Sequence, residues 1–221
     1  MIGRGVLLAV SLVQAPPYRD GWRPWTVAVG ASAFAALPAV LHLPRGAPSC
    51  APCDPLTLSP FDRWVVRLDS RAAGTASNVV LAGVVGGGLL ASRSRGNIAM
   101  MVNAVAFTQV TTEWTKALVH RSRPIMYTSR ATGVMDDRDN RRSFPSGHTA
   151  TAFAVATSYA IMARQQHLPH ATRNSILLYA GAGGVGAMRV AAGRHFVTDV
   201  VGGAVLGTVV GWVTAKVFPT R

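Results

Sequence analysis

Apolar stretches of about twenty residues alternate with short polar connections along most of this sequence. A helix of that length is long enough to cross the hydrocarbon core of a membrane. Six such stretches are separated clearly enough to be counted. The predicted helices span residues 24–43, 72–91, 97–119, 149–164, 174–192 and 197–218.

Glycine is frequent inside these stretches, with 22 glycines in 221 residues. Glycine in an isolated soluble helix is costly, whereas small residues let membrane helices approach closely. The pattern therefore predicts an all-α fold, a six-helix transmembrane bundle. A soluble all-α domain with Ala- and Gly-rich buried helices stays open as an alternative, because the mean hydropathy is only +0.28.

The first 23 residues do not fit this alternation. Arg4, an apolar run over residues 6–13 and a small residue at Ala15 resemble a short secretory signal. The same residues also suit an uncleaved amphipathic lead-in, and the run is too short to span a bilayer. We therefore divide the chain into a lead-in or signal-like segment, 1–23, and one membrane domain, 24–221.

The connection over residues 44–71 contains five prolines, so its first half is not regular helix. Its second half has apolar residues at helical spacing with charged residues opposite, which predicts a short helix on the membrane interface. The apolar positions are Phe61, Trp64, Val65 and Leu68, and the charged ones are Asp62, Arg63, Arg67 and Asp69. Cys50 and Cys53 are the only cysteines, too few for a structural zinc site. Both a disulfide and a pair of free thiols remain open.

The formal net charge of +13 indicates an anionic partner. The basic residues are scattered or gathered in one loop, without the interleaved aromatic side chains of a nucleic-acid groove. The composition thus argues against nucleic acid. It favours membrane lipids or a phosphate-bearing substrate.

The first of three polar segments ends the helix predicted over residues 97–119. Glu113, Lys116, His120 and Arg123 follow at spacings of three and four, which would place them on one helical face. Lys116 and Arg123 are then suited to hold one polyanionic group. The polar loop over residues 125–143 is expected to serve solvation or local ion pairing.

The second segment, residues 144–150, opens the next predicted helix. Helix initiation near His148 leaves unpaired backbone donors beside Ser146 and Gly147, which makes an anion cradle. His148 at its edge could give a proton to a leaving oxygen. In the third segment His195 and Asp199 lie four residues apart, so the carboxylate could bond one imidazole nitrogen and leave the other free as a nucleophile.

Taken together, the three segments resemble the signature of a known family. Lys116 to Arg123-Pro124, then Pro145-Ser146-Gly147-His148, then Arg189 to His195 and Asp199 are similar in order and spacing to the type 2 phosphatidic acid phosphatase (PAP2) superfamily. That superfamily includes lipid phosphate phosphatases, bacterial acid phosphatases and vanadium haloperoxidases. The resemblance covers roughly residues 60–215. Met188 departs from it, since the family usually has Ser before the arginine.

The resemblance implies a role for each motif residue. His195 would attack phosphorus to form a phosphohistidine, Asp199 would fix its tautomer, and His148 would protonate the leaving alkoxide and later activate water. The phosphoryl oxygens would be held without a metal or cofactor. The expected phosphate-binding residues are Lys116, Arg123, Ser146, Gly147 and Arg189.

With the predicted spans, these roles indicate an integral membrane phosphatase for a lipid phosphate monoester or pyrophosphate. Two alternatives remain: a vanadate-dependent haloperoxidase-like enzyme with His195 on vanadium, and a non-catalytic lipid-phosphate-binding membrane protein. Six spans would put the three motifs and the cysteine pair on one side. The resemblance implies that this side faces out of the cytoplasm. We expect an uncleaved amino terminus in the cytoplasm of a bacterium and a site on the periplasmic face of its inner membrane.

Overall fold

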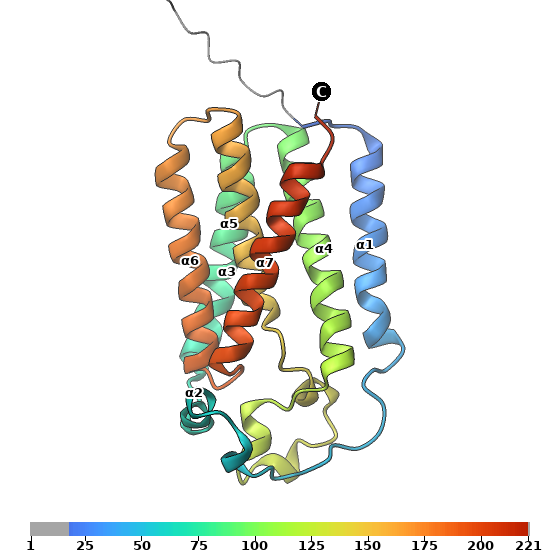
Figure 1. Cartoon of the computed structure of the whole chain (residues 1–221), viewed down its shortest axis with the longest axis vertical. Coiled ribbons are helices and arrows are strands. Elements are labelled where there is room, and N and C mark those ends of the chain that lie inside the picture. The colour runs from blue at the N-terminus through green and yellow to red at the C-terminus, as the bar shows by residue number, and fades with distance from the viewer. Residues whose placement is uncertain (1–17, 221) are drawn as a thin grey trace, which may run out of the picture.

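The protein is a bundle of six long α-helices that run side by side (Figure 1). It is seen here as a computed structural model that describes residues 18–220. The first 17 residues of the predicted lead-in therefore lie outside the described residues. The long helices are α1 (Trp22–Val40), α3 (Arg71–Ala91), α4 (Arg95–Val119), α5 (Gly147–Gln165), α6 (Ala171–Ala191) and α7 (Val197–Val217).

The all-α prediction is confirmed. Between residues 18 and 220 there is no strand, and one isolated bridge joins Tyr18 to Thr220 near the two ends of the described chain. Within the described residues the helix count differs from the prediction, because the four-residue helix α2 (Pro60–Arg63) makes seven. The six long helices agree with the predicted ranges to within a few residues, since each apolar stretch is bounded by polar residues.

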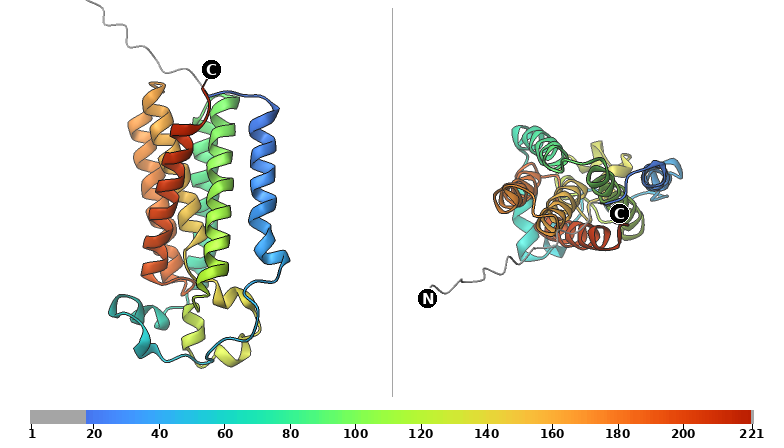
Figure 2. Two further views of the ribbon diagram at one scale, coloured as in Figure 1. Left: turned by 45° about the vertical axis from the view of Figure 1, so that its right-hand side comes forward. Right: turned by 90° about the horizontal axis from the view of Figure 1, so that it is seen from above.

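Helix α5 lies in the middle of the bundle when it is viewed along the helix axes (Figure 2). It is packed against α3, α4, α6 and α7, whereas α1 lies at the edge against α4. The buried core around α5 is made of aliphatic, methionine and tyrosine side chains. It includes Met100, Met101, Val155, Tyr159, Met162 and Val185.

The two faces of α7 have different side chains. Gly203, Gly207 and Gly211 recur every four residues on the face toward α5, where a methyl group on Gly207 would collide with the carbonyl oxygen of Ala150. The opposite face carries exposed valines, among them Val201 and Val205. Small residues between helices and apolar residues facing outward are the arrangement expected of membrane helices.

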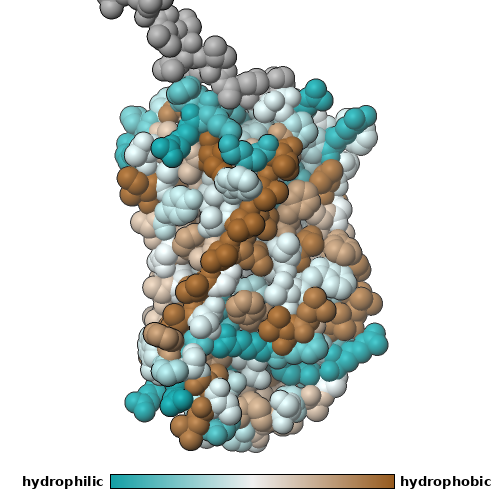
Figure 3. All heavy atoms as spheres, in the orientation of Figure 1, coloured by the Kyte–Doolittle hydropathy of each residue, from teal (hydrophilic) through white to brown (hydrophobic). Residues whose placement is uncertain are grey.

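Two helices in the described part of the chain, α3 and α7, are long and apolar enough to cross a membrane. The prediction of six spans is thus supported for these two by length and composition. Helix α4 is long enough to span a membrane but is less apolar than α3 and α7, because it contains polar and charged residues such as Asn97, Glu113 and Lys116. In the view of Figure 3, hydrophobic side chains follow the middle of the bundle and hydrophilic side chains gather toward its two ends.

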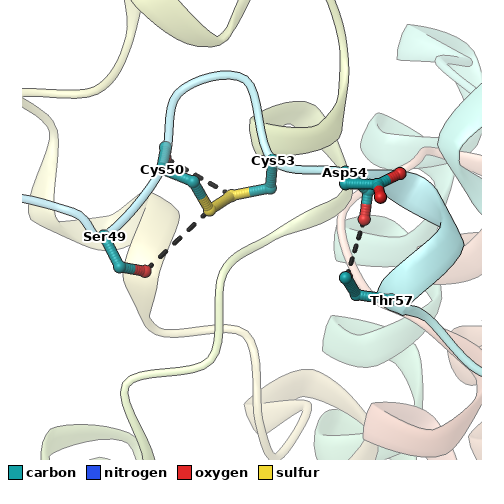
Figure 4. The surroundings of a disulfide bond; sticks show 5 residues. All are labelled: Ser49, Cys50, Cys53, Asp54 and Thr57. Carbon is teal, nitrogen blue, oxygen red and sulfur yellow. Dashed lines mark hydrogen bonds between the residues drawn. A yellow bond between two sulfur atoms is a disulfide. The ribbon is translucent and has the colours of Figure 1, made fainter.

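Cys50 and Cys53 form a disulfide in the connection between α1 and α2 (Figure 4). This decides between the two possibilities left open by the sequence. The backbone N–H of Cys53 donates to the carbonyl oxygen of Met126 at 2.8 Å, so the connection is tied to the loop that follows α4. This loop and the connection between α1 and α2 lie at the end of the bundle where α5 and α7 begin (Figure 1).

The predicted interfacial helix is shorter than expected and differently oriented. Helix α2 ends at Arg63, and a 3-10 turn follows over Trp64–Arg67. Phe61 is 74% exposed and Trp64 50% exposed, whereas Asp62 is only 1% exposed. The prediction that Asp62 lies on the solvent face is therefore wrong. The reason is that Asp62 has cationic and hydroxyl partners in the interior.

Helix α4 also ends earlier than the spacing of its charged residues suggested. His120 takes a left-handed conformation with φ 53°, which stops the helix after Val119. Arg123 therefore lies in the following loop and does not share a helical face with Lys116. The loop instead returns Arg123 toward Lys116 from outside the helix.

Candidate active site

A cavity of about 620 Å³ opens at the end of the bundle where α5 and α7 begin. Its wall combines α3, the end of α4, the start of α5, the end of α6 and the loop before α7. Six of the eight residues predicted from the motifs line it. They are Lys116, Arg123, Gly147, His148, Arg189 and His195.

Two cations of the cavity wall have carboxylate partners. Lys116 Nζ lies 2.8 Å from Glu113 Oε1, and Arg123 lies 2.9 Å from Asp139. Glu113 also pairs with Arg142, so the loop over residues 125–143 forms local ion pairs as predicted. A Cβ on Gly147 would come within 3.3 Å of Lys116 Nζ, which places the ammonium group directly beside the start of α5.

Arg189 differs from these two cations. It is 8% exposed, its Nε has no hydrogen-bond partner, and no carboxylate of residues 18–220 forms an ion pair with it. A charge that is largely removed from water is costly unless it is paired. The cavity wall therefore contains a guanidinium group whose natural complement is an anion.

The amino terminus of α5 adds backbone donors to this positive surface. Helices α3 and α4 each begin with a serine whose hydroxyl caps a free N–H. In α5 the N-cap residue Ser146 makes no such bond, and its hydroxyl lies 3.0 Å from that of Thr149. The first N–H groups of α5 are thus left for another acceptor. Ser146 itself is fully buried and does not line the cavity, in contrast to the predicted contact of its side chain with phosphate.

His195 reaches the cavity from the loop between α6 and α7. Its Nδ1 donates to the carbonyl oxygen of Ser143 at 2.8 Å, so the Nε2 lone pair is the one left for chemistry. The side chain is 2% exposed. Burial lowers the pKa of His195 from 6.5 to about 4, with Arg123 and Arg189 acting in the same direction and Asp199 opposing them. The imidazole is therefore neutral at physiological pH, as a nucleophile must be.

Asp199 supports His195 less directly than the sequence predicted. Its Oδ2 is 3.7 Å from Nδ1, beyond hydrogen-bond distance. Instead, Oδ2 accepts from the Ser143 hydroxyl at 2.6 Å and from the backbone N–H of Phe196 at 2.8 Å. The carboxylate thus fixes Ser143, whose carbonyl group orients the imidazole, and it caps the start of α7.

Arg121 completes this support and was not identified from the sequence. Its guanidinium lies 2.5 Å from Asp199 and 2.8 Å from Asp62. Asp62 in turn accepts from the backbone N–H and the hydroxyl of Thr198. Burial alone would raise the pKa of Asp62, but these hydrogen bonds and the Arg121 charge hold it below its usual value. Arg121 lies inside the first motif at no distinctive spacing, so no sequence signal could have singled it out.

Asn78 is a second residue that the motif analysis missed. Its carboxamide oxygen lies 2.8 Å from Nε2 of His148. Asn78 is on α3, with Arg71, Gly74 and Thr75 on the same helical face and all four lining the cavity. This spacing of polar residues in an otherwise apolar helix was the signal that could have found it.

The arrangement is suited to phosphoryl transfer. A neutral, oriented imidazole at His195 and a second histidine share one cavity with five cationic side chains and a helix amino terminus. Positive groups fixed in place stabilise the charge that develops on the phosphoryl oxygens. Among residues 18–220 no group of three histidine, cysteine or acidic side chains is arranged to hold a metal ion.

Comparison with known proteins agrees with this chemistry. The chain is 39% identical over 83 residues to a lipid A 1-phosphatase of Porphyromonas gingivalis. The aligned region covers 34% of this chain and 17% of that protein. The chain therefore matches about a sixth of the length of that relative.

Two solved structures align with this chain. LpxE of Aquifex aeolicus aligns with a TM-score of 0.50 and 22% identity, over 70% of this chain and 92% of that one. A transmembrane PAP2-type phosphatidylglycerolphosphate phosphatase of Bacillus subtilis aligns with a TM-score of 0.49 and 21% identity, over 89% and 95% of the two chains. The sequence model of the PAP2 superfamily matches residues 97–221, more than half of the chain and all three motifs. The chain belongs to the PAP2 superfamily.

Proposed function

We propose that this protein is an integral membrane phosphatase that hydrolyses a lipid phosphate monoester or pyrophosphate through a phosphohistidine on His195. The observation that carries the proposal is the buried guanidinium of Arg189, which faces the same cavity as His195 without a carboxylate partner among the described residues. A bound phosphoryl group would supply the missing negative charge. It would also lie within the field of Lys116 and Arg123 and of the free N–H groups of α5.

In the first step, Nε2 of His195 attacks phosphorus and the bond from phosphorus to the leaving oxygen breaks. His148 gives its proton to that oxygen, so the product leaves as an alcohol or as a phosphate. In the second step His148 takes a proton from water, the water oxygen attacks phosphorus, the bond from phosphorus to Nε2 of His195 breaks, and inorganic phosphate leaves. Arg189, Arg123 and Lys116 hold the equatorial oxygens in both transition states, a task that needs no metal.

A lipid substrate is supported by the position of the cavity and by the relatives. The cavity lies at one end of a bundle in which α3 and α7 are candidate spans. A phosphate at the level of lipid headgroups would reach such a cavity while the acyl chains stay in the bilayer. The matched relative from Porphyromonas gingivalis is named for action on lipid A.

The disulfide supports a periplasmic site. Disulfides persist in oxidising compartments and are rare in the cytoplasm. Because Cys50–Cys53 and the cavity share one end of the bundle, we place that end on the periplasmic face of a bacterial inner membrane.

The test is to trap the intermediate. The His195→Ala and His148→Ala variants are mixed with a ³²P-labelled aryl phosphate, quenched in alkali, and examined for protein-bound label. An aryl leaving group departs without protonation, so the His148→Ala variant should still accumulate a phosphoenzyme, and its label should map to His195. Label in the His195→Ala variant, or label on His148 in the native protein, would reverse the assigned roles.

Chelation tests the metal-free chemistry. Hydrolysis of a detergent-solubilised lipid phosphate should persist in EDTA, and vanadate should inhibit it by imitating the trigonal bipyramidal phosphoryl group. Loss of activity in EDTA that magnesium restores would contradict the metal-free mechanism and leave the phosphohistidine to be judged by the trapping experiment.

A further inference from the structure

One wall of the cavity comes from a part of the chain outside the three motifs. Arg71, Thr75 and Asn78 recur on α3 at intervals of four and three, which places them on one helical face. All three line the cavity, whereas Val79, the next residue, is 66% exposed and does not. Helix α3 also precedes residues 97–221, the region matched by the family model. This wall therefore adds to the site something that the motifs do not describe.

The contact that matters on this wall joins Asn78 to His148. Asn78 Oδ1 lies 2.8 Å from Nε2 of the imidazole. A carboxamide oxygen only accepts hydrogen bonds, so Nε2 must carry the hydrogen. No hydrogen bond joins Nδ1 of His148 to another residue within the described part of the chain. Nδ1 is thus the nitrogen available to a substrate.

We propose that Asn78 is the positioning residue of the proton donor, holding the Nε2–H of His148 so that Nδ1 faces the leaving-group oxygen and, in the doubly protonated ring, gives it a proton. This inference rests on the proposed phosphatase function. Under this proposal the two histidines use opposite ring nitrogens for chemistry. In His195 the Nδ1–H is bound to the carbonyl group of Ser143 and Nε2 reacts, whereas in His148 the Nε2–H is bound and Nδ1 reacts.

An amide suits this task better than a carboxylate. A carboxylate next to the ring would stabilise the charged imidazolium and make its proton harder to transfer. The cations facing the ring from α4, the following loop and α6 are Lys116, Arg123 and Arg189. The remaining charged or titratable groups of the cavity wall are Asp69, Arg71, Asp139, Arg194 and His195. A neutral partner orients His148 among these groups without adding another charge.

The direct test observes the ring nitrogens and needs no turnover. Protein labelled with ¹⁵N-histidine is studied in detergent micelles, and the His148 signals are assigned by their loss in His148→Gln. The native protein should show the Nε2–H tautomer above the pH at which His148 titrates. Asn78→Ala should give a mixture of tautomers, and Asn78→Asp should shift the titration of His148 to higher pH. The Nδ1–H tautomer in the native protein, or an unchanged spectrum in Asn78→Ala, would overturn the proposal.

A kinetic test then asks whether the positioning matters for proton donation. Asn78→Ala should slow hydrolysis of an alkyl lipid phosphate roughly ten-fold more than that of an aryl phosphate, because only the alkyl leaving group needs a proton. Asn78→Asp should move the basic limb of the kcat profile to higher pH. Val79→Ala is the matched control and should leave both substrates unaffected.

Equal losses on the two substrates, with an unmoved pH profile, would show a merely structural role for Asn78 and contradict the proposal. If the native protein hydrolyses neither substrate, the phosphatase function fails, and the nitrogen spectra still decide whether Asn78 sets the tautomer. The two proposals can therefore fail separately.

Discussion

Arg121 and Asp199 form a 2.5 Å ion pair behind the buried imidazole of His195. Asp199 also accepts from the hydroxyl of Ser143, whose carbonyl group orients the ring. Burial of the ring, together with the charges of Arg123 and Arg189, lowers the pKa of His195 and outweighs the opposing effect of Asp199. The imidazole of His195 is thus kept neutral by its surroundings, while Arg121, Asp199 and Ser143 hold it in position.

The first prediction concerns the second partner of Arg121. Asp62→Asn leaves the guanidinium with one carboxylate and weakens the bonds to Thr198, so the free energy of unfolding should fall by about 3 kcal/mol. The matched control is Asp69→Asn. Asp69 is 53% exposed and pairs with the exposed Arg130, and its loss should cost about 0.5 kcal/mol or less. Thermal unfolding in detergent measures both, and equal shifts would contradict a structural role for the buried network.

The second prediction separates the effect of Arg189 on the stability of the ligand-free protein from its effect on phosphate binding. Arg189→Met removes a buried charge that lacks a partner, so it should stabilise the ligand-free protein by about 1 kcal/mol. The same change should abolish the rise in melting temperature that phosphate or vanadate causes in the native protein. Arg130→Met, which alters an exposed pair, should change neither quantity. A variant that melts earlier and still responds to phosphate would show that Arg189 has another role.

The third prediction follows from the lowered pKa of His195. The unfolded chain takes up a proton on this histidine below pH 6.5, whereas the folded protein does so only near pH 4. Stability from this group is therefore fully present above pH 6.5 and is lost as the pH falls toward 4, by on the order of 1 kcal/mol per pH unit. Melting temperatures of the native protein and His195→Gln should converge as the pH is lowered across this range. Parallel curves would show that His195 does not titrate differently on folding.

The fourth prediction concerns topology. After reduction, a membrane-impermeant thiol reagent should label Cys50 and Cys53 in intact cells, because the disulfide lies at the proposed periplasmic end. Without reduction there should be no labelling on either side. Labelling after reduction that appears only in lysed cells would place the cavity in the cytoplasm.

Much of the fold can be predicted from the pattern of apolar and polar residues along the sequence. The six long helices are bounded by local changes from apolar to polar residues, and those changes can be read directly. The motif residues Lys116, His148 and His195 converge on one cavity because helices that alternate in direction bring every second connection to the same end. Such convergence depends on the order of the helices and very little on side-chain detail.

The supporting residues could not be predicted in the same way. Asp62, Arg121 and Asp199 meet through separations of 59 and 78 residues, which no local spacing encodes. The earlier end of α4 depends on the left-handed conformation of His120, which the spacing of the charged residues does not reveal. Nδ1 of His195 lies 2.8 Å from the carbonyl oxygen of Ser143 and 3.7 Å from Asp199, and only the packed structure determines which of the two is its partner.

The glycine face of α7 has a consequence for how the two histidines are held. Methyl groups on Gly203, Gly207 and Gly211 would each meet backbone atoms of residues 146–154, so the main chains of α5 and α7 touch over successive turns. Two helices in such contact move as one rigid body, because any sliding would have to separate all the contacts together. The separation between His148 at the start of α5 and His195 just before α7 is therefore fixed by backbone geometry.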